Sequence, residues 1–386
     1  MMKTLRDVTV RNATVLLRVD YNVPVDKTSG LVTDTARIEE TKPTITYLRE
    51  QGAKIVLLAH FGRPKGKVNE ALRFKTIVPT ISQVLGVPVG YCAAAIGAEA
   101  KAAVTKMSAG DVLLLENIRF YPGEESNDPE FAKQVAELGD VYVNDAFGAA
   151  HRAHASTAGV AALLPHAAGL LMQREVEELT KVLTAPTAPV VAIIGGAKIS
   201  TKIALIRNLL PKVDYMLLGG ALANTLLLAQ NHKVGKSLVE IDLADTVKDL
   251  LSNKLKLPVD VVVAKAVADN IPKRVVSLGE VEPDDYILDI GPDTAKVYED
   301  CIKKAKTVIW NGPMGVFEFE AFAMGTYHVA KAVANSGAYS VLGGGETVSA
   351  VSKNGLEDKI SFISTGGGAM LEFLEGKTLP GVAALE

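Results

Sequence analysis

The chain has 386 residues, of which 48% are apolar, and it carries 41 Lys and Arg against 44 Asp and Glu. This length predicts two or three folded domains, and the apolar content excludes a disordered chain. A formal net charge of −3 argues against nucleic acid or an anionic membrane surface as the main partner. The two cysteines, Cys92 and Cys301, cannot build a disulfide framework. Residues 1–10 lack the apolar stretch of a signal peptide, so we expect a cytoplasmic protein.

Short apolar runs recur along the chain and alternate with longer stretches of helical periodicity. The runs that predict strands are 14–19, 54–59, 111–115, 141–143, 190–194, 215–218, 259–264, 307–310, 340–342 and 360–363. Continuous apolar runs of this length are typical of buried parallel strands. The pattern therefore predicts an α/β protein made of two Rossmann-like domains, each a parallel sheet flanked by helices.

The boundary between the two domains is predicted near the middle of the chain. A helical stretch at 170–183 follows Pro165 and precedes 184–189, which contains two further prolines. Proline and small residues around one helix indicate a hinge with a connecting helix. The predicted domains are 1–170 and 171–376, with 170–183 as the connecting helix.

Polar and basic residues follow the predicted strands of the first half. Ligands of open parallel sheets bind beyond the carboxyl ends of the strands, where guanidinium groups can bind phosphate or carboxylate. A single arginine there is more often a solvated surface residue, but several at one edge indicate a site for a small polyanion. The candidates are Arg37, Arg63, Arg119 and Arg152, with His60, Asp20 and Asn22 beside them. His151 and His154 flank Arg152 without a third metal ligand, so we expect them to have structural or hydrogen-bonding roles.

Glycines follow the predicted strands of the second half. They lie at 195–196, 219–220, 312, 343–345 and 366–368. Glycine turns between a strand and a helix bring backbone N–H groups close to a phosphate. One such turn is as often purely structural, but five in one domain indicate a nucleotide site. After the first turn, Lys198 and Lys202 have a spacing that would place them on one helix face.

Standard nucleotide and nucleophile motifs are missing. The fragment at 234–237 has Gln230 where a Walker motif needs its first glycine, and no strand is followed by GxGxxG. Glu318 and Glu346 lie near the glycine turns, so one could bind a ribose hydroxyl and the other Mg²⁺. A small-anion domain hinged to a nucleotide domain suits phosphoryl transfer with domain closure.

Nine motifs in order make the chain resemble the phosphoglycerate kinase family over nearly its full length. They are 18–24 (RVDYNVP), 60–64 (HFGRP), 114–124 (LLENIRFYPGE), 142–154 (YVNDAFGAAHRAH), 195–202 (GGAKISTK), 257–264 (LPVDVVVA), 310–318 (WNGPMGVFE), 343–347 (GGGET) and 364–369 (STGGGA). The resemblance implies reversible transfer of the acyl phosphate of 1,3-bisphosphoglycerate to Mg-ADP by direct in-line attack. It also implies a monomer whose segment 377–386 returns to the first domain.

The resemblance also implies a role for each matched residue. Asp20 and Asn22 would bind the glycerate part of the substrate, and its non-transferred phosphate would be bound by His60, Arg63, Arg119 and Arg152. Arg37 would bind the acyl end and, with Lys198, neutralise the transferred phosphoryl group, and Lys202 would complete the catalytic set. The other implied nucleotide-binding residues are Gly195, Lys202, Gly219, Gly291, Asn311, Glu318, Gly344, Gly345, Glu346 and Thr347, with Gly367 and Gly368 as a phosphate cradle.

Three positions depart from the family pattern. Glu346 stands where Asp is usual as the Mg²⁺ ligand, Ala149 replaces a common Thr, and Phe61 replaces Leu. Two alternatives are another hinged kinase acting on a different phosphorylated acid and a nucleotide-dependent binding protein without catalysis. The first fits the glycerate-site residues less well, and the second requires loss of Arg37, Lys198 or Lys202, which are all present.

Overall fold

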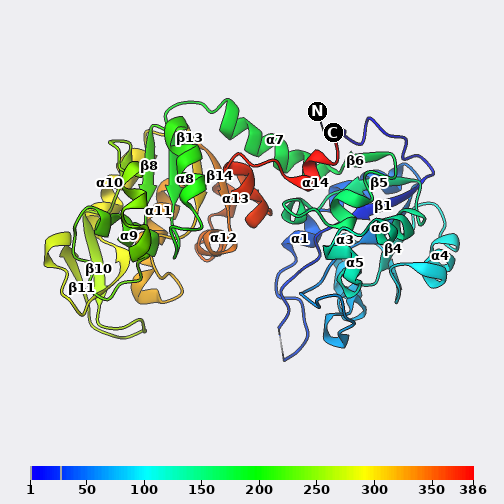
Figure 1. Ribbon diagram of the computed structural model, residues 1–386, viewed down its shortest axis with the longest axis horizontal. Coiled ribbons are helices and arrows are strands. Elements are labelled where there is room, and N and C mark those ends of the chain that lie inside the picture. The colour runs from blue at the N-terminus through cyan, green and yellow to red at the C-terminus, as the bar shows by residue number, and fades with distance from the viewer. Residues whose placement is uncertain (1, 27) are drawn as a thin grey trace. The chain divides into compact units, whose positions relative to one another are not determined.

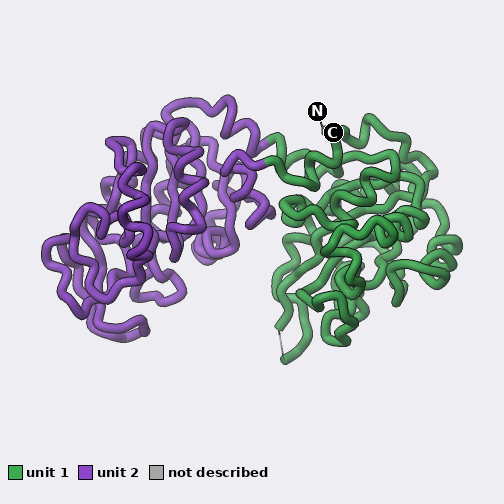
Figure 2. The backbone as a smooth tube through the Cα atoms, in the orientation of Figure 1, with its two compact units in different colours: residues 1–177, 378–386 green, residues 178–377 purple. Residues whose placement is uncertain are grey.

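The structure, a computed structural model, describes residues 2–26 and 28–386. The chain forms two compact units, coloured separately in Figure 2. Unit 1 contains residues 1–177 and 378–386, and unit 2 contains residues 178–377. Within the described part of the chain, no helix combines the length and apolar character that a membrane span requires.

Unit 1 is built on one six-stranded parallel sheet with the strand order β3-β4-β2-β1-β5-β6. The strands are β1 (Thr14–Arg18), β2 (Lys54–Leu58), β3 (Val89–Cys92), β4 (Val112–Leu115), β5 (Val141–Asn144) and β6 (His166–Ala168). The helices are α1 (Ala36–Glu39), α2 (Lys42–Glu50), α3 (Val78–Leu85), α4 (Gly97–Thr105), α5 (Pro122–Glu125), α6 (Pro129–Ala136) and α14 (Pro380–Ala383). In the central strand β1, Val15, Leu16 and Leu17 are fully buried, which explains its continuous apolar sequence.

Unit 2 has a six-stranded parallel sheet of order β15-β14-β13-β7-β8-β9 and a separate three-stranded sheet of order β11-β10-β12. The strands are β7 (Val190–Ile194), β8 (Tyr215–Leu218), β9 (Leu255–Lys256), β10 (Asp260–Ala264), β11 (Lys273–Ser277), β12 (Tyr286–Ile290), β13 (Thr307–Asn311), β14 (Tyr339–Gly343) and β15 (Phe362–Ser364). The helices are α8 (Ile203–Leu209), α9 (Ala221–Ala229), α10 (Pro292–Ile302), α11 (Met324–Asn335), α12 (Gly345–Ser352) and α13 (Gly368–Leu374). These sheets and flanking helices confirm the predicted α/β class (Figure 1).

The predicted parallel strand at 259–264 is wrong in its direction. This segment forms β10, which pairs antiparallel with both β11 and β12. Its apolar run reflects burial on both faces, since Val261 and Val263 pack in one apolar cluster while Val262 and Ala264 pack in another. The continuous apolar run therefore indicates that both faces of the strand are buried, but it does not indicate whether the strand is parallel or antiparallel.

Helix α7 (Leu170–Thr184) joins the two units, and the division of the chain falls within it, between residues 177 and 178. Its first turn is anchored in unit 1, because Oδ1 of Asp145 accepts the backbone N–H groups of Leu171 at 2.9 Å and Met172 at 3.1 Å. Thr44 accepts the N–H of Leu170 at 2.9 Å. These acceptors satisfy donors that a helix start leaves unpaired.

The C-terminal segment 378–386 belongs to unit 1 and is held there by backbone hydrogen bonds. The N–H of Gly381 donates to the carbonyl of Ala150 at 2.8 Å, and the carbonyl of Leu385 accepts from Lys3 at 2.7 Å. The end of the chain therefore packs next to Ala150, on the segment after β5, and next to Lys3.

Candidate active site

Hydrogen bonds join most of the predicted anion-binding residues at the carboxyl edge of the unit 1 sheet. Arg37 donates from Nη1 to Oδ2 of Asp20 at 2.9 Å and to the carbonyl of Asn22 at 3.2 Å. Oδ1 of Asn22 accepts the N–H of Gly62 at 2.8 Å, and Arg119 donates to the Gly62 carbonyl at 3.1 Å. The loops after β1, β2 and β4 thus form one connected cluster.

Several cations share this cluster with few counter-charges. Burial, with Arg18 adding to it, lowers the pKa of Arg119 to about 10. Burial and the neighbouring arginines hold the pKa of His60 well below its usual value. The same causes lower the pKa of His154 to about 4. The unit 1 edge therefore has unbalanced positive charge that an anion can neutralise.

Two predicted arginines lie less centrally in this cluster. Arg152 donates from Nε to Nε2 of His151 at 3.2 Å, and it contributes repulsion to both Arg119 and His154. Arg63 is exposed on the loop after β2. Among the described residues, no hydrogen bond links Arg63 to the rest of the cluster, so its proposed role depends on the family resemblance.

Arg18 is a component of the site that was not predicted from the sequence. Arg18 is the last residue of β1, and its side chain is fully buried beneath the cluster, within 3.1 Å of His60. A charged residue that ends a buried apolar strand was the available signal, because an unpaired buried arginine is strongly disfavoured.

In unit 2, one pocket of about 560 Å³ collects most of the predicted phosphate-binding residues. Glycine turns before α12 and α13 line it together with the loop after β7. The predicted residues in its wall are Gly195, Lys198, Lys202, Asn311, Gly344, Gly345, Glu346, Thr347, Gly367 and Gly368. Gly344 has a φ of +95° and Gly367 a φ of +51°, and this left-handed backbone favours glycine.

The predicted helical spacing of Lys198 and Lys202 is wrong, because α8 begins only at Ile203. The segment before it forms turns, and Ser200 fixes them by donating its N–H and hydroxyl to Glu240 at 2.8 Å and 2.6 Å. Both lysines nevertheless line the same pocket. The turns before α8, and not a helix, therefore place both lysines at this pocket.

Lys202 is buried and donates from Nζ to Oδ1 of Asn311. Burial lowers the pKa of Lys202 to about 8, although the carboxylates of Glu346 and Glu375 act in the opposite direction. Asn311 is itself held by its donation to the Gly343 carbonyl at 2.7 Å. The ammonium group is therefore positioned, and none of the described carboxylates forms an ion pair with it, which leaves its charge to a bound phosphate.

A second pocket, of about 450 Å³, adjoins the first and shares Gly196, Ala197 and Glu346 with it. Its wall is largely apolar and includes Leu238, Pro258, Val267, Tyr286 and Met314, none of which was predicted as a site residue. Leu238 is 52% exposed and Val267 is 44% exposed, so apolar surface lies open here. An apolar pocket beside a phosphate pocket suits a nucleobase and its phosphates.

Of the remaining predicted nucleotide residues, Glu318 lines the apolar pocket, whereas Gly219 and Gly291 line neither. A Cβ at Gly219 would lie 2.6 Å from Sδ of Met314, and one at Gly291 would lie 2.2 Å from the Asp260 carboxyl group. In this structure both glycines allow close packing behind the pocket wall.

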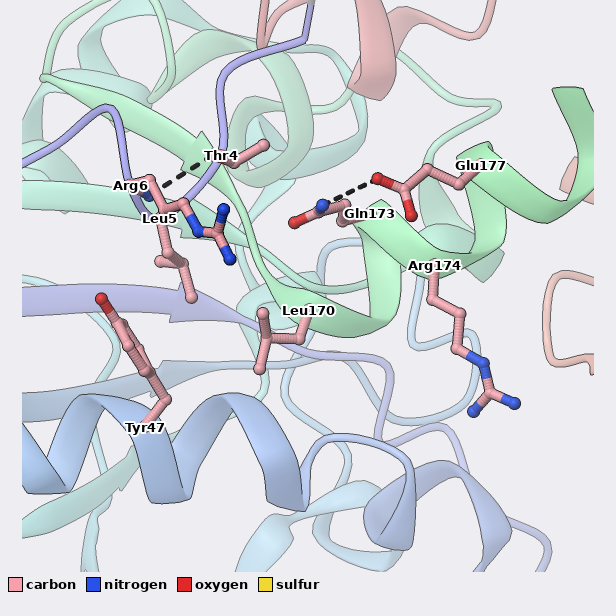
Figure 3. A pocket seen from close by; sticks show the side chains of 8 residues that line it. All are labelled: Thr4, Leu5, Arg6, Tyr47, Leu170, Gln173, Arg174 and Glu177. Carbon is pink, nitrogen blue, oxygen red and sulfur yellow. Dashed lines mark hydrogen bonds between the residues drawn. The ribbon is translucent and has the colours of Figure 1, made fainter.

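A further pocket, of about 510 Å³, lies within unit 1 and contains none of the predicted site residues. Figure 3 shows Leu5, Tyr47 and Leu170 around it, with Arg6 above them. Gln173 donates to Glu177 at 2.7 Å on the rim formed by α7. This pocket is formed by the N-terminal segment, α2 and α7, and so it is separate from the basic cluster.

The site's two parts define a class of protein. A cationic sheet edge in one unit, with adjoining phosphate and apolar pockets in the other, belongs to a phosphotransferase that uses a nucleotide and a small anionic substrate. A family model described as Phosphoglycerate kinase matches residues 5–377. The chain belongs to the phosphoglycerate kinase family.

Individual relatives support this assignment. The chain is 54% identical to phosphoglycerate kinases of Moorella thermoacetica and Herpetosiphon aurantiacus, in each case over 99% of this chain and 98% of the relative. The solved structure of phosphoglycerate kinase from Coxiella burnetii is 41% identical, with a TM-score of 0.90, and covers 100% of this chain and 99% of its own. The chain therefore catalyses the reversible transfer of the acyl phosphate of 1,3-bisphosphoglycerate to ADP, a glycolytic reaction that yields 3-phosphoglycerate and ATP.

Proposed function

We propose that unit 1 binds 3-phosphoglycerate or 1,3-bisphosphoglycerate and that unit 2 binds ADP or ATP. This assignment rests on one observation: the two units present different chemical groups to a ligand. The hydrogen-bonded cluster around Asp20 and Arg119 suits a small, highly charged acid. The unit 2 pockets combine backbone donors and lysines with an apolar wall, as a nucleotide requires.

In unit 1, Asp20 and Asn22 would bind the hydroxyl and carboxylate region of the glycerate. The non-transferred phosphate would be bound by His60, Arg63, Arg119 and Arg152. Arg37 would bind the acyl end, because its guanidinium is held by Asp20 at the exposed side of the cluster. Guanidinium groups suit these oxygens because they offer paired donors.

In unit 2, Lys202 would bind nucleotide phosphates, with backbone donors from the turns before α12 and α13. Lys198 is exposed at the same pocket and would neutralise the transferred phosphoryl group, as Arg37 would in unit 1. Glu318 would accept from the ribose. Gly219 and Gly291 would act by letting the base pocket close tightly around the adenine.

The residues present fit a Mg²⁺ ion that is bound with the nucleotide. Glu346 lies exposed in the first turn of α12, where the phosphate pocket and the apolar pocket share a wall. Its carboxylate is the type of ligand that Mg²⁺ prefers alongside phosphate oxygens. The bound ion would supply charge neutralisation for those phosphates.

The reaction needs no covalent enzyme intermediate. An oxygen of the ADP β-phosphate attacks the acyl phosphorus, and the bond from phosphorus to the carboxyl oxygen breaks, so that 3-phosphoglycerate leaves as its carboxylate. The residues of the chain position both ligands and neutralise charge. We propose that hinge bending at α7 brings the two ligands together and excludes water.

We further propose that the protein acts as a monomer in the cytoplasm. Each ligand would be bound by residues of a single chain, so the reaction needs no second copy. The free thiols of Cys92 and Cys301 are compatible with a reducing compartment. Sedimentation at working concentration tests the monomer, and a stable dimer would contradict it.

Separate binding titrations of 3-phosphoglycerate and Mg-ADP test the division of roles. Arg119→Met should weaken 3-phosphoglycerate binding by roughly tenfold or more and leave Mg-ADP binding unchanged, since a charged hydrogen bond contributes about 1.5–3 kcal/mol. Lys202→Met should have the opposite pattern. The exposed residues Arg11 and Lys359, changed to Met, are the matched controls. The assignment would be overturned if Arg119→Met weakened Mg-ADP binding and Lys202→Met weakened 3-phosphoglycerate binding.

A further inference from the structure

Arg18 forms a buried contact with His60 that limits where the histidine can carry its proton. Nη2 of Arg18 lies 3.1 Å from Nδ1 of His60. A guanidinium group has only donors, so Nδ1 of His60 must be the acceptor in this hydrogen bond. An acceptor nitrogen carries no proton, and the ring is therefore neutral with its proton on Nε2.

The other cations that face His60 favour the same neutral state, and the one facing carboxylate is too distant to hold a proton on Nδ1. Oδ1 of Asp20 lies 3.8 Å from Nδ1, which is too far for a hydrogen bond that would hold a proton there. Arg37, Arg119 and His154 all oppose a positive charge on the ring, and the ring is only 5% exposed. Within the described part of the chain Nε2 of His60 forms no hydrogen bond with the protein, so its N–H is available to a ligand.

A second set of buried contacts fixes the Arg18 guanidinium. Its Nε donates to Oγ of Ser156 at 2.9 Å, and Nη1 donates to the carbonyl of Val19. Oγ of Ser156 donates in turn to Oε1 of Glu124 at 2.6 Å, and the N–H of Ser156 donates to Oε2 at 2.9 Å. The Arg18, Ser156 and Glu124 side chains are fully buried, so the guanidinium cannot turn away from His60 without losing several hydrogen bonds.

We propose that Arg18 is a positioning residue, which holds His60 as a neutral ring and presents its Nε2–H to the non-transferred phosphate of the substrate. Arg18 itself stays beneath the cluster and acts through His60. The inference rests on the proposed role of His60 in phosphate binding. It adds that this histidine contributes a directed neutral donor, whereas the surrounding arginines contribute the charge.

Nitrogen NMR of the ligand-free protein tests the protonation state without any assumption about the substrate. The chain has six histidines, and comparison with His60→Gln identifies the His60 signals. The expected result is a proton-bearing Nε2 and a bare Nδ1, unchanged between about pH 8 and pH 5.5. A proton on Nδ1, or titration of the ring near its usual pKa of about 6.5, would overturn the proposal.

The Arg18→Gln variant tests the cause of this state, with Arg11→Gln as the control at an exposed position. Loss of the fixed donor should let His60 populate both tautomers and become protonated at higher pH. An unchanged His60 spectrum in folded Arg18→Gln would show that Arg18 does not set the tautomer. Should this variant fail to fold, the spectrum of the unmodified protein still decides whether His60 is a neutral Nε2–H donor.

Binding of 3-phosphoglycerate separates this inference from the proposed function. A glutamine amide nitrogen can occupy nearly the place of Nε2, so His60→Gln should retain affinity to within a few-fold, whereas His60→Ala should lose roughly tenfold. The ratio of wild-type to His60→Gln affinity should stay constant from about pH 8 to pH 5.5, because titration of the ligand cancels in it. A ratio that rises on acidification would contradict a neutral His60. Unchanged affinity in His60→Ala would contradict the phosphate-binding role instead.

Discussion

The guanidinium of Arg37 is held by the carboxylate of Asp20 through a hydrogen bond of 2.9 Å from Nη1 to Oδ2. Arg37 is 37% exposed at its side chain, whereas Asp20 is 13% exposed, so the carboxylate is the more buried partner of the pair. Nη1 also donates to the Asn22 carbonyl at 3.2 Å. The protein therefore orients the guanidinium through Nη1, and the donors on Nε and Nη2 are left for a ligand.

Arg37→Ala should therefore reduce turnover much more than nucleotide affinity. Loss of a donor that stabilises charge in the transition state costs roughly 10²–10³ in kcat. The Kd for Mg-ADP should remain within about twofold, because the proposed nucleotide pocket belongs to unit 2. A coupled assay of ATP formation and a separate ADP titration measure the two effects, with Arg11→Ala as the control. Near-normal turnover of Arg37→Ala would remove it from the proposed catalytic set.

The lowered pKa of Lys202 predicts that nucleotide binding depends on pH. Burial sets this pKa at about 8, so part of the protein carries a neutral lysine at pH 8.5. A bound phosphate favours the ammonium form and raises the pKa, so ADP binding should take up a fraction of a proton at pH 8.5 and weaken as the pH rises further. Below about pH 7 the lysine is already charged, and this effect should vanish.

Calorimetry in buffers with different ionisation enthalpies measures the proton uptake at pH 8.5, where the phosphates of ADP are fully ionised. Lys202→Arg keeps its charge at this pH and should abolish the Lys202 contribution. Equal apparent enthalpies in all buffers for the unmodified protein would contradict the prediction.

The position of Glu346 leads to a prediction of how turnover depends on the Mg²⁺ concentration. Its carboxylate lies in the first turn of α12 at the wall shared by the two unit 2 pockets. Glu346→Gln removes the charge and should raise the half-saturating Mg²⁺ concentration by roughly tenfold or more, whereas Glu346→Asp keeps a carboxylate and should stay within about threefold. A Mg²⁺ titration of turnover at saturating ADP distinguishes these outcomes. Identical curves for all three proteins would exclude Glu346 as a metal ligand.

The sequence predicted the α/β class because the buried central strands, such as β1 and β7, are continuous apolar runs. It predicted polar residues at one sheet edge because the carboxyl ends of parallel strands meet there. The direction of β10 was not predictable from its run, since a strand covered on both faces has the same composition in either direction. Strand β11 was not predicted because four of its five residues are exposed, so it lacks the continuous apolar run that marks β1 and β7.

The candidate site was predictable where its charged residues follow the end of a strand. Arg119 follows the end of β4 by four residues and Lys202 follows the end of β7 by eight, and the structure places each with other predicted residues. The apolar pocket was not predictable, because Leu238 and Tyr286 are distant in sequence and belong to no periodic pattern. Arg18 was missed because its signal, a charged residue at the end of a buried apolar strand, is weak: an exposed strand-end arginine has the same sequence pattern.

We expect Asp289, a buried carboxyl group in unit 2, to make a pH-dependent contribution to the stability of the protein. Its Oδ2 accepts the N–H of Gly325 at 2.7 Å and its Oδ1 accepts that of Ile290 at 2.9 Å. Burial nevertheless raises the pKa of Asp289 to about 7 from its ordinary value of 3.8. The folded protein therefore retains a proton that the unfolded chain releases, so the stabilising effect of this proton is complete below about pH 4 and is lost as the pH rises through about 7.

Asp289→Asn mimics the protonated acid at every pH and should remove this dependence. The difference in melting temperature between Asp289→Asn and the unmodified protein should grow in favour of the variant between about pH 4 and pH 7 and stay constant above about pH 7, because other titrating groups cancel in the comparison. The corresponding free-energy difference is on the order of a few kcal/mol. The exposed Asp293, changed to Asn, controls for the loss of one surface charge. A difference that does not change with pH would show that Asp289 is ionised throughout, since only a proton held by the folded state can produce the predicted slope.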